Sequence, residues 1–317
     1  MLLQTADPLA RFHDRLRLPL IAAPMFLISG VELVAAACAN GVIGAFPTVN
    51  CRSPEELDAW LTGIETRLRG QNAAPICPNL IVHRSNARLD DDLKVLLRHD
   101  CEIVVTSVGP PTPVIKPLHD AGALVLADVA SLRHAERALE AGADGLVLLT
   151  AGAGGQTGWL NSFAFVRAVR AFFEGPIVLA GGIADGKALR AAQVLGCDLA
   201  YMGTKFIATR ESMADQRYKA MLVASTADDI LLTTAFTGLQ TNMLKPSIVA
   251  AGLDPDDLPA RGAIAIGKDI DVAERESRPK RWRDIWSAGH STSGVTDIPF
   301  VEELIARLRA EYAAAAF

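Results

Sequence analysis

Short apolar runs recur along the chain and alternate with longer amphipathic stretches. Strands that are buried on both faces have this continuous apolar character, whereas a half-exposed strand alternates apolar and polar positions. The pattern therefore predicts eight strands of a parallel sheet. The runs occupy residues 20–23, 42–46, 76–82, 103–106, 123–127, 146–149, 176–180 and 198–202.

Helical patterns separate these predicted strands, so that each strand and its following helix form one βα unit. Eight such units favour a closed barrel over an open doubly wound sheet. We therefore predict an α/β protein with a TIM (β/α)8 barrel and a small, mostly helical insertion near the C-terminus. The clearest helical segments lie at residues 31–40, 54–68, 87–99, 132–141, 162–173 and 186–195.

The βα rhythm stops after about Arg210, where residues 211–244 are typical of helix and loop. We expect residues 1–210 and 298–317 to form the barrel, with a terminal helix closing on it, and residues 211–297 to form an insertion with its connections. The insertion is apolar enough to pack over the barrel mouth as a lid. Its segment 221–234 could serve either this lid or a homodimer contact.

Composition favours small-molecule chemistry. The net charge of the 317 residues is -5, and no run of Lys and Arg interleaved with aromatic residues is present, so nucleic acid is not an expected partner. The five cysteines are scattered without a C-x-x-C pair, which argues against a disulfide scaffold or a zinc site. Histidines and carboxylates show no spacing typical of metal ligands.

The N-terminal residues lack the basic start and apolar segment of a secretory signal. The longest apolar runs are also far shorter than the ~18 residues needed to span a membrane. We therefore expect a cytoplasmic protein without a membrane partner.

Glycine-rich turns follow the sixth, seventh and eighth predicted strands, at residues 151–158, 180–183 and 202–204. Exposed backbone N–H groups in such turns bind anions, and barrels often hold a phosphate in the loops after strands seven and eight. Turn and helix-capping geometry alone would also use glycine. Three clusters on one rim favour phosphate binding, and the candidate residues are Gly154, Gly155, Gly181, Gly182, Gly203 and Thr204.

Other unusual residues fall at the same rim, because they lie at or just after the C-terminal ends of predicted strands. This is the end at which barrels carry their active sites. The residues are Pro24, Met25, Asn79, Ser107 and Asp128.

With these residues in view, the chain resembles the nitronate monooxygenase (2-nitropropane dioxygenase-like) family of FMN-dependent barrels over essentially its whole length. The motifs at residues 24–30 (Pro-Met-Phe-Leu-Ile-Ser-Gly) and 46–52 (Phe-Pro-Thr-Val-Asn-Cys-Arg) are similar to those of a bacterial subgroup that contains NADH:quinone reductases. The segments that carry the resemblance, in the family's order, are 24–30, 44–50, 77–83, 151–155, 180–183 and 201–206.

The resemblance implies non-covalent FMN. Its phosphate would be bound by the Gly181-Gly182 and Gly203-Thr204 turns, with Pro24 and Met25 beside the isoalloxazine ring. Asn79 would hydrogen-bond the polar edge of the flavin, although a loop-capping role for Asn79 is also open.

Residue 156 departs from the family pattern, because nitronate oxidisers have a histidine base after the glycine pair and this chain has Gln156. A neutral amide cannot take up a proton near pH 7, but it can donate and accept hydrogen bonds. Gln156 is therefore a candidate for orienting a substrate oxygen. An anionic nitronate, which needs no deprotonation, suits this site better than a neutral nitroalkane.

Two rim residues are candidates for a replacement base. His83 follows the third predicted strand and has an ordinary pKa of ~6.5, although a structural hydrogen-bonding role competes with a catalytic one. Asp128 lies at the end of the fifth strand, where an N-cap or a loop anchor is the competing interpretation.

Phe26 and Trp159 are the candidate residues of the substrate pocket. Trp159 follows the first glycine-rich turn and would form a wall of the pocket if this loop reached over the flavin. The alternative is that Trp159 only packs the loop against the next helix.

Three functions fit these features. The first is FMN-dependent oxidation of alkyl nitronates with molecular oxygen. The second is a reductase in which NAD(P)H reduces the flavin and a quinone or an enoyl thioester accepts the electrons; a separate Rossmann motif is not present for it. The third keeps the barrel but binds a phosphorylated metabolite in place of FMN.

Overall fold

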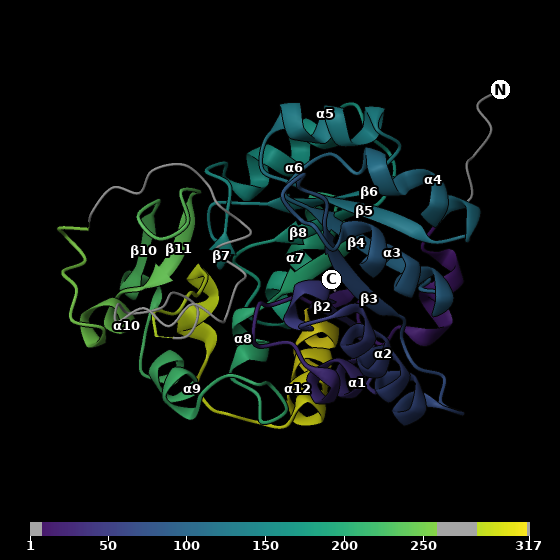
Figure 1. The fold of residues 1–317 in the computed structure, drawn as a ribbon. Coiled ribbons are helices and arrows are strands. Elements are labelled where there is room, and N and C mark those ends of the chain that lie inside the picture. Colours follow the sequence, from purple (N-terminus) through teal and green to yellow (C-terminus); the bar gives the residue numbers. More distant parts are fainter. Residues whose placement is uncertain (1–7, 259–283, 316–317) are drawn as a thin grey trace.

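Eight parallel strands close into a barrel in the computed structural model, which describes residues 8–258 and 284–315 (Figure 1). Closure occurs where β1 pairs with β9, with Leu20 opposite Ala200. The eight predicted strands are thereby confirmed, and so is the TIM barrel. The strands are β1 (Leu20–Ala22), β2 (Ile43–Pro47), β3 (Ile76–Ile81), β4 (Ile103–Ser107), β5 (Leu124–Val129), β6 (Gly145–Leu149), β8 (Ile177–Ala180) and β9 (Leu199–Met202).

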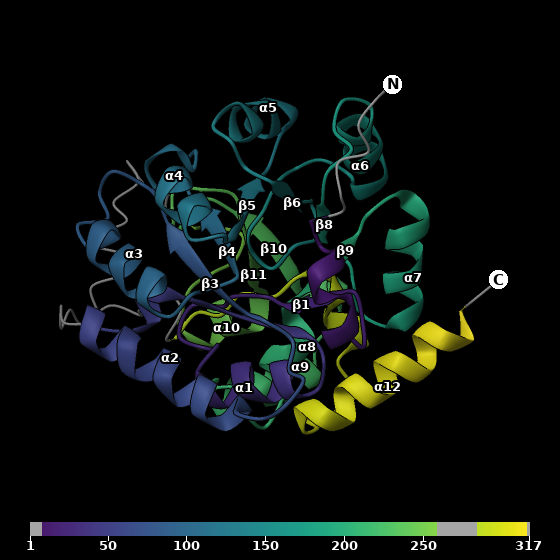
Figure 2. The ribbon, with the colours of Figure 1, turned by 90° about the vertical axis from the view of Figure 1, so that its right-hand side faces the viewer.

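Helices surround the barrel as an outer ring, which is seen along the barrel in Figure 2. Several begin where the sequence supplies a cap: the side chains of Ser53, Ser131 and Asp185 accept hydrogen bonds from the first turns of α2, α5 and α7. The helices are α1 (Val31–Ala39), α2 (Pro54–Leu68), α3 (Leu89–Arg98), α4 (Thr112–Asp120), α5 (Leu132–Glu140), α6 (Ser162–Arg170), α7 (Gly186–Leu195), α8 (Thr204–Ile207) and the terminal α12 (Val301–Ala314), which packs on α7 and α1.

The core has an inner and an outer part because side chains alternate between the two faces of each strand. Apolar residues such as Ile21, Val105 and Val178 fill the barrel interior, while Leu20, Leu146 and Leu179 pack outward on the helices. At the C-terminal ends of β3, β4, β5 and β9 the inward positions become polar. The barrel mouth therefore presents polar side chains to a ligand.

The insertion covers the mouth and contains more sheet than the sequence indicated. Residues 211–244 were expected to be helix and loop, but two antiparallel strands form there, β10 (Ile230–Thr233) and β11 (Thr241–Leu244). β11 also pairs with β7 (Gly155–Gln156), a short strand of the glycine-rich loop, so Thr241 lies opposite Gln156. The remaining described elements are α9 (Gln216–Val223) and α10 (Lys245–Ala250), with short 3-10 turns at Ala10–Arg15, Thr48–Asn50, Ala227–Asp229 and His290–Gly294.

Within the described ranges, no helix is long and apolar enough to cross a membrane.

The insertion and the barrel loop are joined by a side chain as well as by strand pairing. Asn242 of β11 is 1 % exposed, and its Nδ2 donates to the carbonyl oxygens of Ala151 and Ala153 at 2.9 and 2.7 Å. One buried amide therefore holds the loop that presents Gln156.

Replacing Asn242 with alanine should lower the free energy of unfolding by about 1–3 kcal/mol, because two buried carbonyl oxygens lose their donor. Urea unfolding of the N242A variant would measure the loss. Asn72→Ala is the matched control, since the Asn72 side chain makes a single bond, to the Asp14 carbonyl oxygen, on the exposed surface. Equal effects of the two substitutions would show that the Asn242 contact is not important for stability.

Candidate active site

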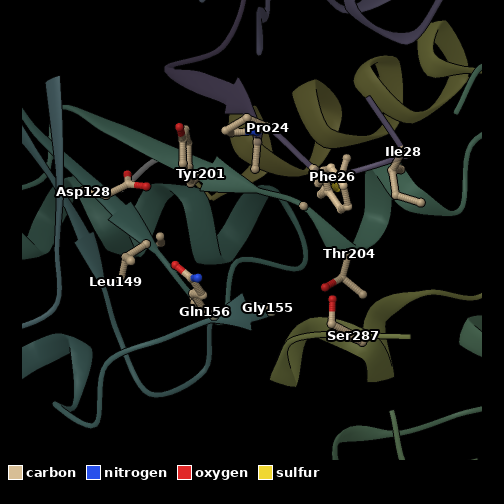
Figure 3. A pocket seen from close by; sticks show the side chains of 18 of the residues that line it. Pro24, Phe26, Ile28, Asp128, Leu149, Gly155, Gln156, Tyr201, Thr204 and Ser287 are labelled. Carbon is tan, nitrogen blue, oxygen red and sulfur yellow. The ribbon is translucent and has the colours of Figure 1, made fainter. Parts of the chain in front are cut away.

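One cavity lies at the C-terminal end of the barrel, between the strand ends and the insertion (Figure 3). Every barrel strand or the loop after it contributes to its wall. The insertion supplies the opposite side with Tyr218, Thr237, Leu239 and the segment 286–288 together with Ser291. The cavity is therefore the place where the rim residues predicted from the sequence can meet a ligand.

The turn after β1 brings Pro24, Met25 and Phe26 to the cavity. This turn is held by Asn50, whose side chain accepts from Leu27 N at 2.9 Å and donates to the carbonyl oxygens of Met25 and Ser29 at 3.1 and 2.9 Å. Leu27 has a φ of +60°, a conformation that a branched side chain rarely adopts, so the turn depends on this support. The asparagine of the 46–52 motif is thus a scaffold for the cavity wall.

The floor of the cavity is polar. Asn79 and Ser107 come from adjacent strands, and the Ser107 hydroxyl donates to Asn79 Oδ1 at 3.3 Å. Asp128 lies on the next strand, and Tyr201 reaches the floor from β9. Burial raises the pKa of Asp128 to about 7, because water solvates its charged form poorly there.

The glycine-rich loop after β6 forms the next wall. Gly155 has a φ of +70°, and Gln156 follows it on β7 with an exposed side chain that borders the cavity. Gly154 packs backbone against backbone, since a Cβ atom there would lie 2.7 Å from the nitrogen of Gly289. A larger residue at position 154 would push the insertion away from the loop.

Backbone and hydroxyl groups gather at the other end of the cavity. Gly181 and Gly182 have φ values of +122° and +76°, and their N–H groups donate to no other described residue. Thr204 is 4 % exposed, its Oγ1 accepts from Gly289 N at 3.0 Å, and the hydroxyl of Ser287 points toward it (Figure 3). Such an end suits an anionic group.

The helix that follows the glycine pair contributes less to this end than the sequence indicated. The first turn of α7 is already capped, because Asp185 accepts from Ala188 N at 2.7 Å and Glu311 accepts from Gly186 N at 2.9 Å. An anion at Gly181 and Gly182 would therefore be bound by the turn itself rather than by the end of the helix.

The structure brings together most of the predicted site residues but not all of them. Two do not line the cavity: Trp159, which is 69 % exposed, and His83, whose Nδ1 is 2.8 Å from the hydroxyl of Ser85. Both follow strand ends, but neither borders the cavity. The predicted residues that do line it are Pro24, Met25, Phe26, Asn79, Ser107, Asp128, Gly154, Gly155, Gln156, Gly181, Gly182, Gly203 and Thr204.

Several lining residues were not predicted. Tyr201 could have been found, because it occupies the inward position of β9 just as Asp128 does on β5. Ser287, Ser291 and Trp286 lie in a segment without periodicity, and only the tertiary structure places them. In the described part of the chain, no group of three His, Cys, Asp or Glu side chains could hold a metal ion.

Solved structures with the same fold include a nitroalkane oxidase from Streptomyces ansochromogenes, with a TM-score of 0.80, 23 % identity and coverage of 96 % of this chain and 99 % of that chain. FabK from Thermotoga maritima aligns with a TM-score of 0.78 at 22 % identity, over 98 % and 97 % of the two chains.

Among curated relatives, a protein named nitronate monooxygenase from Paraburkholderia phytofirmans is 28 % identical over 92 % of both chains. A Mycobacterium tuberculosis protein named (3aS,4S,5R,7aS)-5-hydroxy-7a-methyl-1-oxo-octahydro-1H-indene-4-carboxyl-CoA dehydrogenase is 24 % identical over 73 % of this chain and 64 % of that protein. The barrel, its cavity and these relatives define a flavin-dependent oxidoreductase.

The family can be stated more narrowly, since the family described as nitronate monooxygenase matches residues 13–311. The chain belongs to the nitronate monooxygenase family, and this membership implies a flavin cofactor.

Gly181→Ala should abolish flavin retention. A Cβ atom at this position would collide with Thr150 Oγ1 and lie 2.8 Å from Ala153 N, at a φ that alanine rarely adopts. The flavin-to-protein ratio after purification measures the effect. Gly70→Ala is the control. Gly70 also has a positive φ, of +78°, but it does not line the cavity, and a Cβ atom added there would have no other atom within 4 Å. Normal flavin content in G181A would contradict the assignment of this turn.

Trp159→Ala should leave substrate preference unchanged, because the indole does not line the cavity. Relative kcat/KM values for small and bulky substrates would test this expectation. A selective gain of activity on bulky substrates would show that Trp159 reaches the site during turnover.

Proposed function

We propose that the chain is an FMN-dependent oxidoreductase that oxidises alkyl nitronates with molecular oxygen. The observation that carries this proposal is the position of Gln156, which borders the cavity beside the glycine-rich loop and presents an amide to it. Membership of the nitronate monooxygenase family supports the reaction class.

The cavity fits FMN in three respects. Gly181, Gly182 and Thr204 offer donors for a phosphate, and Ser287 adds a hydroxyl. Pro24, Met25 and Ile183 provide apolar walls for a flat ring. The polar floor, where the Oδ1 atom of Asp128 has no partner among the described residues, suits the polar edge of that ring. When bound, the flavin supplies two-electron chemistry by accepting electrons from the substrate and passing them on.

The chain's own contribution at residue 156 is a hydrogen bond and not proton removal. A glutamine amide can donate to a nitronate oxygen and hold the anion in place, but it cannot abstract the Cα proton of a neutral nitroalkane. The preferred substrate is therefore the preformed nitronate.

We assign residues 211–258 and 284–297 as the lid that separates this chemistry from water; the rest of the predicted insertion, 259–283, lies outside the described residues. Tyr218 and Trp286 stack with ring centroids 4.8 Å apart and an interplanar angle of 8°, and both line the cavity. The Tyr218 hydroxyl donates to the carbonyl oxygen of Ser287. This aromatic pair fixes the lid wall opposite the strand ends.

A second function is favoured by one observation: within the described residues, no Lys, Arg or His lines the cavity, so no cationic side chain there balances the charge of a nitronate. In this alternative, NAD(P)H reduces the flavin, and a quinone or an enoyl thioester is the acceptor. The Mycobacterium tuberculosis relative, whose name describes a CoA thioester dehydrogenase, is consistent with such an acceptor.

Anaerobic reduction of the bound flavin separates the two functions. Bleaching of the flavin absorbance by propionate-3-nitronate, but not by NADH or NADPH, would support nitronate oxidation. Bleaching by a nicotinamide alone would assign the protein to the reductases. A pure protein that binds no flavin after incubation with FMN would contradict both.

Gln156→Ala should lower kcat/KM for a nitronate about tenfold, which corresponds to the loss of one hydrogen bond of about 1–1.5 kcal/mol. Gln156→His should instead create activity on neutral nitroethane, because an imidazole can accept the Cα proton. Steady-state kinetics with both substrates measure these effects. Gln216→Ala, at an exposed helix start on the lid, is the control. Unchanged nitronate kinetics in Q156A would show that Gln156 takes no part in the mechanism.

A further inference from the structure

Two polar atoms on the cavity floor have no hydrogen-bond partner among the described residues: Oδ1 of Asp128 and the hydroxyl oxygen of Tyr201. Both are shielded from solvent, and both side chains line the cavity. Figure 3 shows the carboxyl and the phenol at the same end of the cavity. Leaving such atoms without partners is costly, so a ligand that forms hydrogen bonds with them would be stabilised by removing that cost.

The surroundings of this floor contain few charges. Asp128 and Tyr201 are close enough for the carboxylate to raise the pKa of the phenol, and the thiol of Cys77 on β3 is the other titratable group that faces them. The adjacent strands β4 and β6 contribute Ser107 and Leu149, which do not titrate in this range. No cation within the described ranges compensates a charged carboxylate here, and burial alone raises the pKa of Asp128.

We propose that the carboxyl of Asp128 and the phenol of Tyr201 form the proton-donating pair of this cavity, and that they hydrogen-bond a polar edge of the bound flavin. The inference rests on the flavin site proposed above. In this proposal the proton-carrying group lies on the barrel strands β5 and β9, and not at residue 156, where the chain has an amide.

The proton balance of this pair is simple. The O–H bond of the Asp128 carboxyl breaks, its electrons stay on the carboxylate, and the proton passes to an acceptor atom of the ligand. The carboxylate then regains a proton from water. Tyr201 stays neutral throughout, because burial raises its pKa well above the ordinary value, and it serves as a hydrogen-bond donor.

The dissociation constant of FMN, followed by quenching of flavin fluorescence between pH 5.5 and about 9, tests the pair without any turnover. Above about pH 7, where Asp128 loses its proton, the wild-type dissociation constant should rise about tenfold per pH unit. Asp128→Asn keeps the shape and a donor but carries no ionisable proton, so its profile should lack this rise. The ionisation of the FMN phosphate near pH 6 affects both proteins equally.

Two further variants sharpen the test. Tyr201→Phe removes the second donor to the flavin edge, so the dissociation constant should rise up to about tenfold at every pH, while the further rise above about pH 7 remains. Asp120→Asn, which neutralises an exposed carboxylate on α4, should retain the wild-type profile.

A measurement on the flavin-free protein separates this inference from the proposed function. Because the folded pKa of Asp128 lies above that of an unfolded aspartate, the folded state holds the extra proton between about pH 4 and 7. The stability of the wild type relative to D128N should therefore fall as pH rises through this window. It should be constant above it.

The outcomes are distinct. A steep wild-type profile together with a flat D128N profile supports the pair. Parallel profiles in the two proteins overturn it even when FMN binds tightly. If FMN does not bind at any pH, the proposed function fails, and the stability comparison then decides: a pH-independent difference between wild type and D128N rejects the pair. If D128N does not fold, a Y201F profile that coincides with the wild type also rejects it.

Discussion

Close backbone packing around the glycine-rich loop is the constraint on which the cavity depends. The loop touches the lid on one side, where Gly154 meets the nitrogen of Gly289, and the β8 turn on the other, where Gly181 meets the nitrogen of Ala153. At each contact a Cβ atom would have no room. The loop, the lid and the Gly181-Gly182 turn therefore keep their relative positions because these residues lack side chains, and the shape of the cavity follows from these contacts.

The glycines of these turns therefore have two explanations that the sequence could not separate. Phosphate binding and backbone packing both call for glycine, and the pattern of residues 151–158 is compatible with either. The structure assigns close packing to Gly154, while Gly182 has open space around it and an N–H that donates to no described residue. Gly182 is therefore free to meet a ligand directly.

The fold was largely predictable because the barrel strands are continuously apolar and buried on both faces, for example Leu146, Val147 and Leu148 of β6. The strands of the lid were not, since β10 is only partly buried and its pairing depends on β11 and on the distant β7. The predicted residues at strand ends border the cavity, whereas His83 and Trp159 lie in loops whose direction is set by tertiary contacts. Ser287 had no sequence signal, because it reaches the cavity through the packing of the lid.

The pairing of β7 with β11 allows residue 156 to carry different side chains. Strand pairing uses the main chain, which is the same for every residue type except proline, so the position of residue 156 does not depend on which side chain it carries. Asn242 strengthens this independence, because it binds carbonyl oxygens of the loop and not side chains. A chain built in this way can exchange an imidazole for an amide without rebuilding the loop. During evolution, a single substitution can therefore change the side chain at residue 156 while the surrounding structure stays the same.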